Sequence, residues 1–292
     1  MKILVQHNFS SGLGDFTRNI VQYMYLLRPY KDMGYEINLY INLRGNKYVD
    51  RPFFKKLFSE KTYNFFNSIV ESPNAITSKV LNEYNYVLSA HDPQSPGIHQ
   101  WDLFTDNSNL TDFKLTRTDA GYILINNIKI DNFIFFSEEV ENRVNNFLKK
   151  YPKPFDIIHI RTSDIIDKTT HRYDEIIFKI LNLISNKNKY FYLATNNKYI
   201  FNKLKQEEKI IFYEFKNIDK YSNDINAFTF IDSKFNNNED DSLINRLFDT
   251  TSEMAIFRHS KNIYCYSDLG WVSNFLFYPI YFSKNSINLI NI

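Results

Sequence analysis

Residues 157–164 constrain the fold of this chain more than any other stretch, and they read Ile-Ile-His-Ile-Arg-Thr-Ser-Asp. A β-branched apolar run that ends in polar residues is typical of a buried strand that brings those groups to the carboxyl edge of a parallel sheet. Open α/β folds bind their ligands at that edge. Arg161 suits a phosphate or pyrophosphate there, because its planar guanidinium can donate two parallel charge-assisted hydrogen bonds. The alternative interpretation is a surface strand end with a salt-bridged arginine.

The size of the chain allows one large or two medium domains, since it has 292 residues, of which 43% are hydrophobic. Its formal net charge is only +2. That balance gives no general affinity for nucleic acid or for anionic membranes. Any anion binding must therefore be local.

The single cysteine, Cys265, allows no intrachain disulfide and favours a reducing compartment. It lies in an apolar run without a basic neighbour, which indicates a structural thiol rather than a nucleophile. The N-terminus has no basic segment followed by an apolar stretch of signal-peptide length. No run reaches the ~20 apolar residues needed to span a bilayer. We therefore expect a cytoplasmic protein without a membrane span.

The first half of the chain opens with the pattern of a parallel sheet. Residues 2–6 read as a strand and residues 8–15 as a turn-rich loop; a helix closed by Pro29 and Gly34 follows, and then a strand over 35–41. This β-loop-α-β unit is the usual start of a parallel sheet. Further along, the patterns predict a strand over 86–90, weak β character over 102–135, and a helix from 137.

A linker is predicted at residues 151–155, Tyr-Pro-Lys-Pro-Phe, because two prolines in a short span interrupt both helix and sheet. After the linker the alternation starts again, with helices between strands predicted at 156–160, 190–195, 210–214 and 262–266. We therefore predict an α/β protein with two Rossmann-like domains, residues 1–150 and 155–292, facing a central cleft.

Four strand-to-helix loops are candidates for ligand binding. In the first, Gly12 and Gly14 would let backbone amides approach an anion at a helix N-terminus, although Gly-x-Gly is equally the pattern of a tight turn. The second loop follows the strand that ends near Arg161. The third, residues 194–197, and the fourth, residues 266–271, have small polar residues directly before a helix, which hold phosphate oxygens or simply cap the helix.

No metal site is predicted. The six histidines are scattered, without the close pairing with Cys, Asp or Glu that a zinc site needs. The acidic run at 239–241 reads as a solvated helix start. Neither a Gly-x-Ser-x-Gly elbow nor a P-loop occurs.

Taken in order, these loops resemble the motifs of the fucosyltransferase superfamily that uses GDP-fucose. Residues 11–15, Ser-Gly-Leu-Gly-Asp, are similar to its opening Gly-Gly-Leu-Gly-Asn/Asp element, and residues 159–164 to its His-x-Arg-Arg-Gly-Asp motif. Residues 194–197 resemble the Ala/Ser-Thr-Asp-Asp element after its next strand. Residues 253–271 resemble the last motifs of its α-1,2 group.

This resemblance implies the two-domain glycosyltransferase-B fold and an inverting, metal-independent transfer of a sugar to a glycan or glycoconjugate hydroxyl. It implies that the C-terminal domain holds the nucleotide-sugar donor and that no cofactor is needed. Arg161 would hold the donor pyrophosphate and stabilise the leaving group. Asp15, His91 and Asp92 are the candidate groups for activating the acceptor. The expected donor-binding residues are Gly12, Gly14, His159, Arg161, Asp164, Thr195, Asn196, Ser267, Asp268 and Leu269.

Three departures from the family pattern keep alternatives open. Thr162 replaces a second arginine, Asn196 stands where a carboxylate often reads guanine, and Asp268 replaces a serine beside the expected phosphates. The alternatives are a glycosyltransferase-B enzyme that uses another nucleotide sugar, and a non-catalytic nucleotide- or glycan-binding protein of the same fold. A dinucleotide oxidoreductase is disfavoured, because the first loop lacks the full Gly-x-Gly-x-x-Gly.

Overall fold

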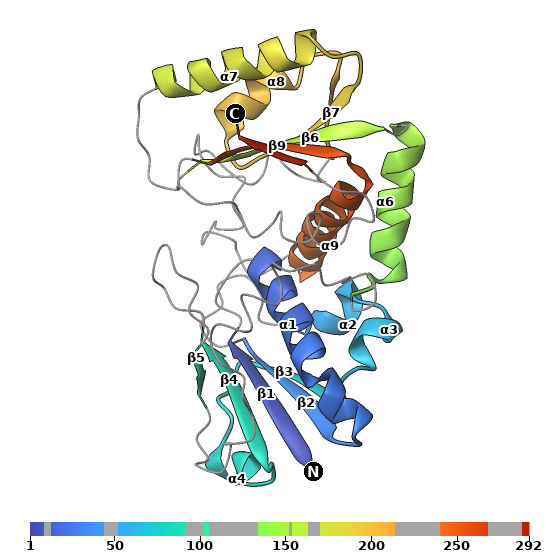
Figure 1. Cartoon of the computed structure of the whole chain (residues 1–292), viewed down its shortest axis with the longest axis vertical. Helices are drawn as coiled ribbons and strands as arrows, with labels where there is room; N and C mark the ends of the chain where they lie inside the picture. Colours follow the sequence, from blue (N-terminus) through green and yellow to red (C-terminus); the bar gives the residue numbers. More distant parts are fainter. Residues whose placement is uncertain are drawn as a thin grey trace. The chain divides into compact units, whose positions relative to one another are not determined.

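The computed structural model describes residues 1–8, 13–43, 52–91, 102–104, 134–151, 154–162, 170–213, 240–267 and 288–291 (Figure 1). The chain divides into two compact units, Met1–Glu139 and Val140–Ile292. Among the described residues each unit has a five-stranded sheet with helices between its strands. The predicted α/β class is confirmed.

The first unit is built on a sheet of strand order β3-β2-β1-β4-β5. Strand β5 runs antiparallel to β4, and the other neighbours are parallel. The predicted opening β-loop-α-β unit is confirmed, whereas β3 was not predicted, because it is short and none of its residues is fully buried. The elements are β1 (Lys2–Asn8), α1 (Leu13–Asp32), β2 (Glu36–Asn42), α2 (Phe54–Leu57), α3 (Glu60–Tyr63), β3 (Ser68–Ser72), α4 (Ser78–Leu81), β4 (Tyr86–His91) and β5 (Asp102–Phe104).

Helix α1 ends at a glycine rather than at its proline. Pro29 lies inside the helix, and the backbone N–H of Met33 still donates to the Pro29 carbonyl at 3.1 Å. Gly34 adopts φ of 86°, the left-handed region in which a residue without Cβ is not strained. The predicted end of the helix was therefore right at Gly34 and wrong at Pro29.

The second unit has an all-parallel sheet of strand order β10-β9-β6-β7-β8. Its central strand, β6, is buried along six of its seven residues, as expected of a strand covered on both faces. Strand β10 was not predicted. The elements are α6 (Glu138–Lys150), β6 (Phe155–Arg161), α7 (Thr170–Ser185), β7 (Tyr190–Thr195), α8 (Lys198–Leu204), β8 (Ile210–Ile211), α9 (Asp240–Ile256), the 3-10 helix η4 (Phe257–His259), β9 (Asn262–Ser267) and β10 (Asn288–Asn291).

The division falls inside helix α6, between Glu139 and Val140, so all but the first two residues of the helix belong to the second unit. The domain predicted from the sequence extended to residue 150. The Phe147 ring lies 5.4 Å from that of Tyr192 on β7, and Arg143 forms an ion pair with Asp249 of α9 at 2.6 Å. These contacts explain why α6 belongs with the second sheet.

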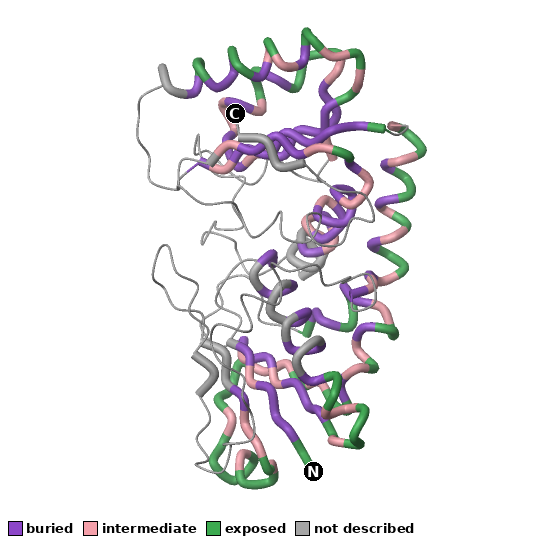
Figure 2. Tube along the Cα trace, in the orientation of Figure 1, coloured by how far each residue is buried: buried purple, intermediate pink, exposed green. Residues whose placement is uncertain are grey.

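The two faces of β6 meet different layers. Ile158 and Ile160 belong to a core cluster with residues of α7 and α8. Because side chains alternate along a strand, His159 and Arg161 point to the opposite face, where the His159 ring lies 6.4 Å from that of Phe257. Figure 1 shows α7 and α8 on one side of this sheet and α9 on the other, and Figure 2 shows the buried strands between them.

Candidate functional site

Three of the predicted donor-binding residues end neighbouring strands of the second sheet. In the parallel register Arg161 pairs with Ser267 of β9, and Ile160 pairs with Thr195 of β7. Arg161, Thr195 and Ser267 are therefore brought to one carboxyl edge, with the arginine in the centre. This is the edge at which open α/β sheets bind ligands.

The Arg161 side chain is half-buried at the end of β6. It is close enough to His159 for its positive charge to contribute to lowering the pKa of that histidine. A half-buried cation on a rigid strand is suited to an anion, because part of its desolvation is already complete before the ligand arrives.

His159 lies beneath the edge rather than at its surface. The side chain is 6% exposed, and burial, followed by the charge of Arg161, lowers the pKa of His159 to about 3. The imidazole is therefore neutral at physiological pH. This burial favours a role for His159 in orienting the loop over the predicted contact with the donor.

Asn196 and Thr162 tie the ends of β7 and β6 together. The Asn196 Oδ1 accepts from the Thr162 backbone N–H at 2.9 Å, and the Asn196 Nδ2 donates to the Thr162 carbonyl at 2.9 Å. The Thr162 hydroxyl lies 3.3 Å from the same Oδ1. Both residues are buried. The side-chain amide of Asn196, which stands where the family has a guanine-reading carboxylate, thus hydrogen-bonds to the backbone of Thr162.

Asn197 caps helix α8, as the simpler interpretation of this loop predicted. Its side-chain oxygen accepts from the Ile200 backbone N–H at 3.1 Å. The Thr195 hydroxyl accepts from the Asn197 N–H at 3.1 Å. The loop after β7 is therefore held rigidly by its own polar side chains.

The described candidates of the first unit lie in the first turn of α1 and at the end of β4. Gly14 is buried in the first turn of α1, and Asp15 follows it in that turn. His91 is the last residue of β4, and β4 pairs with β1 up to His7 and Ala90. The side chains of Asp15, His91 and Ser267 lie outside what the structure describes. Gly12, Asp92, Asp164, Asp268 and Leu269 lie outside the described residues altogether.

A buried polar network under the second sheet was not predicted from the sequence. The Tyr192 hydroxyl donates to Glu253 of α9 at 2.9 Å, and the Tyr213 hydroxyl donates to Asp249 at 3.1 Å. Burial raises the pKa of Glu253 to about 7. A signal existed, since Asp249 and Glu253 are four residues apart and so lie on one helix face, but nothing in the sequence shows which tyrosines they meet.

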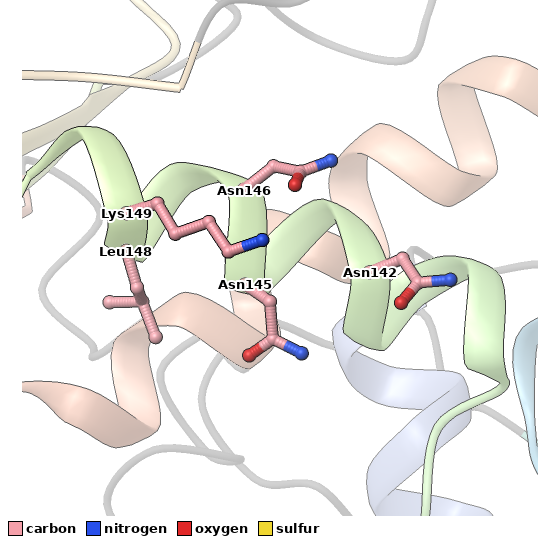
Figure 3. A pocket seen from close by; sticks show the side chains of 5 residues that line it. All are labelled: Asn142, Asn145, Asn146, Leu148 and Lys149. Atoms are coloured by element: carbon pink, nitrogen blue, oxygen red, sulfur yellow. The ribbon is translucent and has the colours of Figure 1, made fainter.

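The described residues contain no group of three potential metal ligands, and none of their helices is long and apolar enough to cross a membrane. A surface hollow of about 550 Å³ lies along the exposed side of α6 (Figure 3). It is lined by Asn142, Asn145, Asn146, Leu148 and Lys149. The thiol of Cys265 is buried on β9, and burial raises its pKa to about 11, which fits a structural residue.

Comparison with known proteins gives a clear answer for the fold. No protein-family profile and no curated sequence matches the chain. Among solved structures, the α-1,6-fucosyltransferase NodZ soaked with GDP-fucose matches with a TM-score of 0.54 and 12% identity, over 97% of this chain and 93% of NodZ. This chain has the same fold as NodZ. NodZ from Bradyrhizobium matches with a TM-score of 0.52 and 12% identity, over 96% of this chain and 93% of the other.

A second fucosyltransferase, POFUT1, shares this fold. Its apo form matches with a TM-score of 0.51 and 12% identity, over 99% of this chain and 98% of POFUT1. The expected glycosyltransferase-B architecture is thus confirmed across nearly the whole length of the chain. Within that fold, the described candidates of the second unit lie at the carboxyl edge of its sheet.

Proposed function

We propose that this protein is an inverting, metal-independent glycosyltransferase that moves fucose, or a related sugar, from a GDP-sugar to a glycan hydroxyl. The observation that carries the proposal is the placement of Arg161 between the ends of β7 and β9, in a chain with the fucosyltransferase fold. We also propose a cytoplasmic location, because the only cysteine of the chain is a buried free thiol.

Arg161 has the central role in this mechanism. In the transfer, the acceptor hydroxyl attacks the anomeric carbon while the bond from that carbon to the β-phosphate oxygen breaks, so the configuration inverts. The departing diphosphate gains negative charge, and the guanidinium stabilises it as a divalent cation would. Ser267 and the backbone after β9 would hold further phosphate oxygens. Asp15, His91 and Asp92 are the candidate groups for accepting the proton of the acceptor hydroxyl.

The test compares wild type with Arg161→Ala by calorimetric titration of GDP, UDP and GDP-fucose in the presence of a chelator. We expect GDP binding by wild type and a loss of at least about 100-fold in the variant, because a partly desolvated charge pair is removed. Lys179→Ala is the matched control. It removes one positive charge from the same unit at an exposed site, so nucleotide binding should not change. A variant at Arg161 that retains GDP binding contradicts the assigned role.

A non-catalytic binding protein is the second candidate, and one observation favours it. Thr162 is fully buried where the family pattern has a second arginine, so this edge has one positive charge fewer. A transfer assay with GDP-fucose across a panel of glycan acceptors separates the two candidates. Transfer that is lost in Arg161→Ala supports the enzyme, and tight GDP binding without transfer to any acceptor supports the binding protein.

A further inference from the structure

The peptide bond after Arg161 is held by a side chain of the neighbouring strand. The Thr162 N–H belongs to the peptide that joins it to Arg161, and this N–H donates to Asn196 Oδ1 at 2.9 Å. The Thr162 carbonyl accepts from Asn196 Nδ2 at the same distance. A backbone N–H can only donate and a carbonyl can only accept, so the orientation of the Asn196 amide is fixed by its partner.

This contact is sheltered from water. Thr162 is fully buried and Asn196 is 8% exposed, so water cannot readily replace a lost hydrogen bond. Asn197 Nδ2 lies 3.5 Å from the Thr162 hydroxyl and adds a weak contact. Beyond Arg161, the regular pairing of β6 with β9 stops at Ser267. Asn196 therefore fixes the backbone of Thr162, the first residue beyond the pairing of β6 with β9.

The two departures at residues 162 and 196 are in direct contact. The family pattern has an arginine and a carboxylate at these positions, and this chain has a hydroxyl and an amide that hydrogen-bond to each other. In this chain the two departures therefore form one buried contact rather than two independent changes.

We propose that Asn196 is a positioning residue, which fixes the peptide after Arg161 and so directs its guanidinium toward the donor pyrophosphate, and that it does not read the base. This inference rests on the proposed function. Its consequence for specificity is that Asn196 contributes equally to the binding of GDP and UDP. Any preference for guanine arises from other residues.

Asn196→Asp distinguishes the two roles by the sign of its effect. A carboxylate can still accept from the Thr162 N–H, but its second oxygen then faces the Thr162 carbonyl, and two acceptors repel. We expect GDP and UDP binding to weaken alike, by tenfold or more. If residue 196 reads guanine, the same variant should bind GDP more tightly, because a carboxylate accepts from both guanine donors, and that result would overturn the proposal.

The experiment is calorimetric titration of GDP and UDP into wild type, Asn196→Asp, Asn196→Ala and Arg161→Lys, with circular dichroism to check folding. Asn142→Asp is the matched control, since it makes the same substitution at an exposed position on α6 and should change affinity by less than twofold. If Asn196→Asp does not fold, Asn196→Ala, which removes both hydrogen bonds to the Thr162 backbone, decides the question by whether GDP and UDP binding weaken alike.

A double variant separates positioning from a general structural role. If Asn196 acts through Arg161, then Asn196→Ala should weaken GDP binding tenfold in wild type but less than threefold in the Arg161→Lys background, where the bidentate geometry is already lost. An equal loss in both backgrounds contradicts the proposal. Absence of nucleotide binding by wild type would instead overturn the proposed function, and this inference with it.

Discussion

The two sheets of this protein each have five strands around a central parallel strand, β1 or β6, but the residues that surround these central strands differ. Both β1 and β6 lie between two parallel neighbours, and both have a buried histidine near the carboxyl end, His7 and His159. Burial lowers the pKa of each to about 3. Beyond the histidine the two strands diverge, since β6 continues to Arg161 whereas β1 ends at Asn8.

The layers that cover the two sheets differ as well. The His7 ring lies 5.1 Å from that of Phe16, and Phe16 packs in turn on Phe53 and Phe54. Behind β6 and β7, α6 and α9 place charged groups, which are paired with one another or with tyrosines. Sheets of the same strand arrangement therefore accept either a mainly apolar layer or a layer with several charged groups, provided that each buried charge has a partner. In this protein the sheet with the charged layer also presents the arginine.

The largest expected effect comes from breaking the charged layer. Asp249→Ala leaves Arg143 partly buried without its carboxylate and should lower the free energy of unfolding by about 3–5 kcal/mol. Urea denaturation followed by circular dichroism measures it. Glu175→Ala is the control, because its pair with Lys179 is exposed and should contribute at most about 0.5 kcal/mol. If both variants lose equally little, the layer does not stabilise the second unit as the comparison requires.

The two buried histidines, His7 and His159, predict that both units lose stability at acidic pH. Their pKa is about 3 in the folded protein against 6.5 for an ordinary histidine, so the unfolded chain binds more protons between these values. Stability therefore falls as the pH decreases below 6.5, by about 2–3 kcal/mol per histidine at pH 4.5. His7→Gln and His159→Gln should each reduce this dependence, measured as the difference in urea midpoint between pH 7.5 and 4.5. An unchanged dependence in either variant would show that its histidine is not buried as described.

The convergence at the sheet edge could be predicted from the sequence, because a single rule governs it. Parallel strands end at one edge, so the ends of three apolar runs must place Arg161, Thr195 and Ser267 together. Strands β3 and β10 were not predicted in this way. Strand β10 has four residues, which is too few for a periodic signal, and β3 is half-exposed.

The role of Asn196 shows where prediction from local pattern stops. An asparagine after a strand is compatible with a helix cap, a ligand contact or a contact between strands, and the sequence does not distinguish among them. The contact that decides is with Thr162, 34 residues earlier. Similarly, the strand pattern places Tyr192 in a buried run, but only the packing of α9 shows that Glu253 accepts its hydroxyl hydrogen.

The smallest expected effect tests the charged layer at Glu253. Burial raises the pKa of Glu253 to about 7 from 4.5, so the folded state binds one more proton than the unfolded state between these values. This carboxyl therefore makes the protein less stable as the pH rises from 4.5 to 7, and the cost remains above pH 7. Glu253→Gln keeps an oxygen to accept from Tyr192 but cannot ionise, so it should stabilise the protein at pH 8 by about 1–3 kcal/mol and have little effect at pH 5. Urea midpoints at the two pH values measure this. A variant that is destabilised at both pH values would show that the Glu253 carboxylate, paired with Tyr192, stabilises the folded protein.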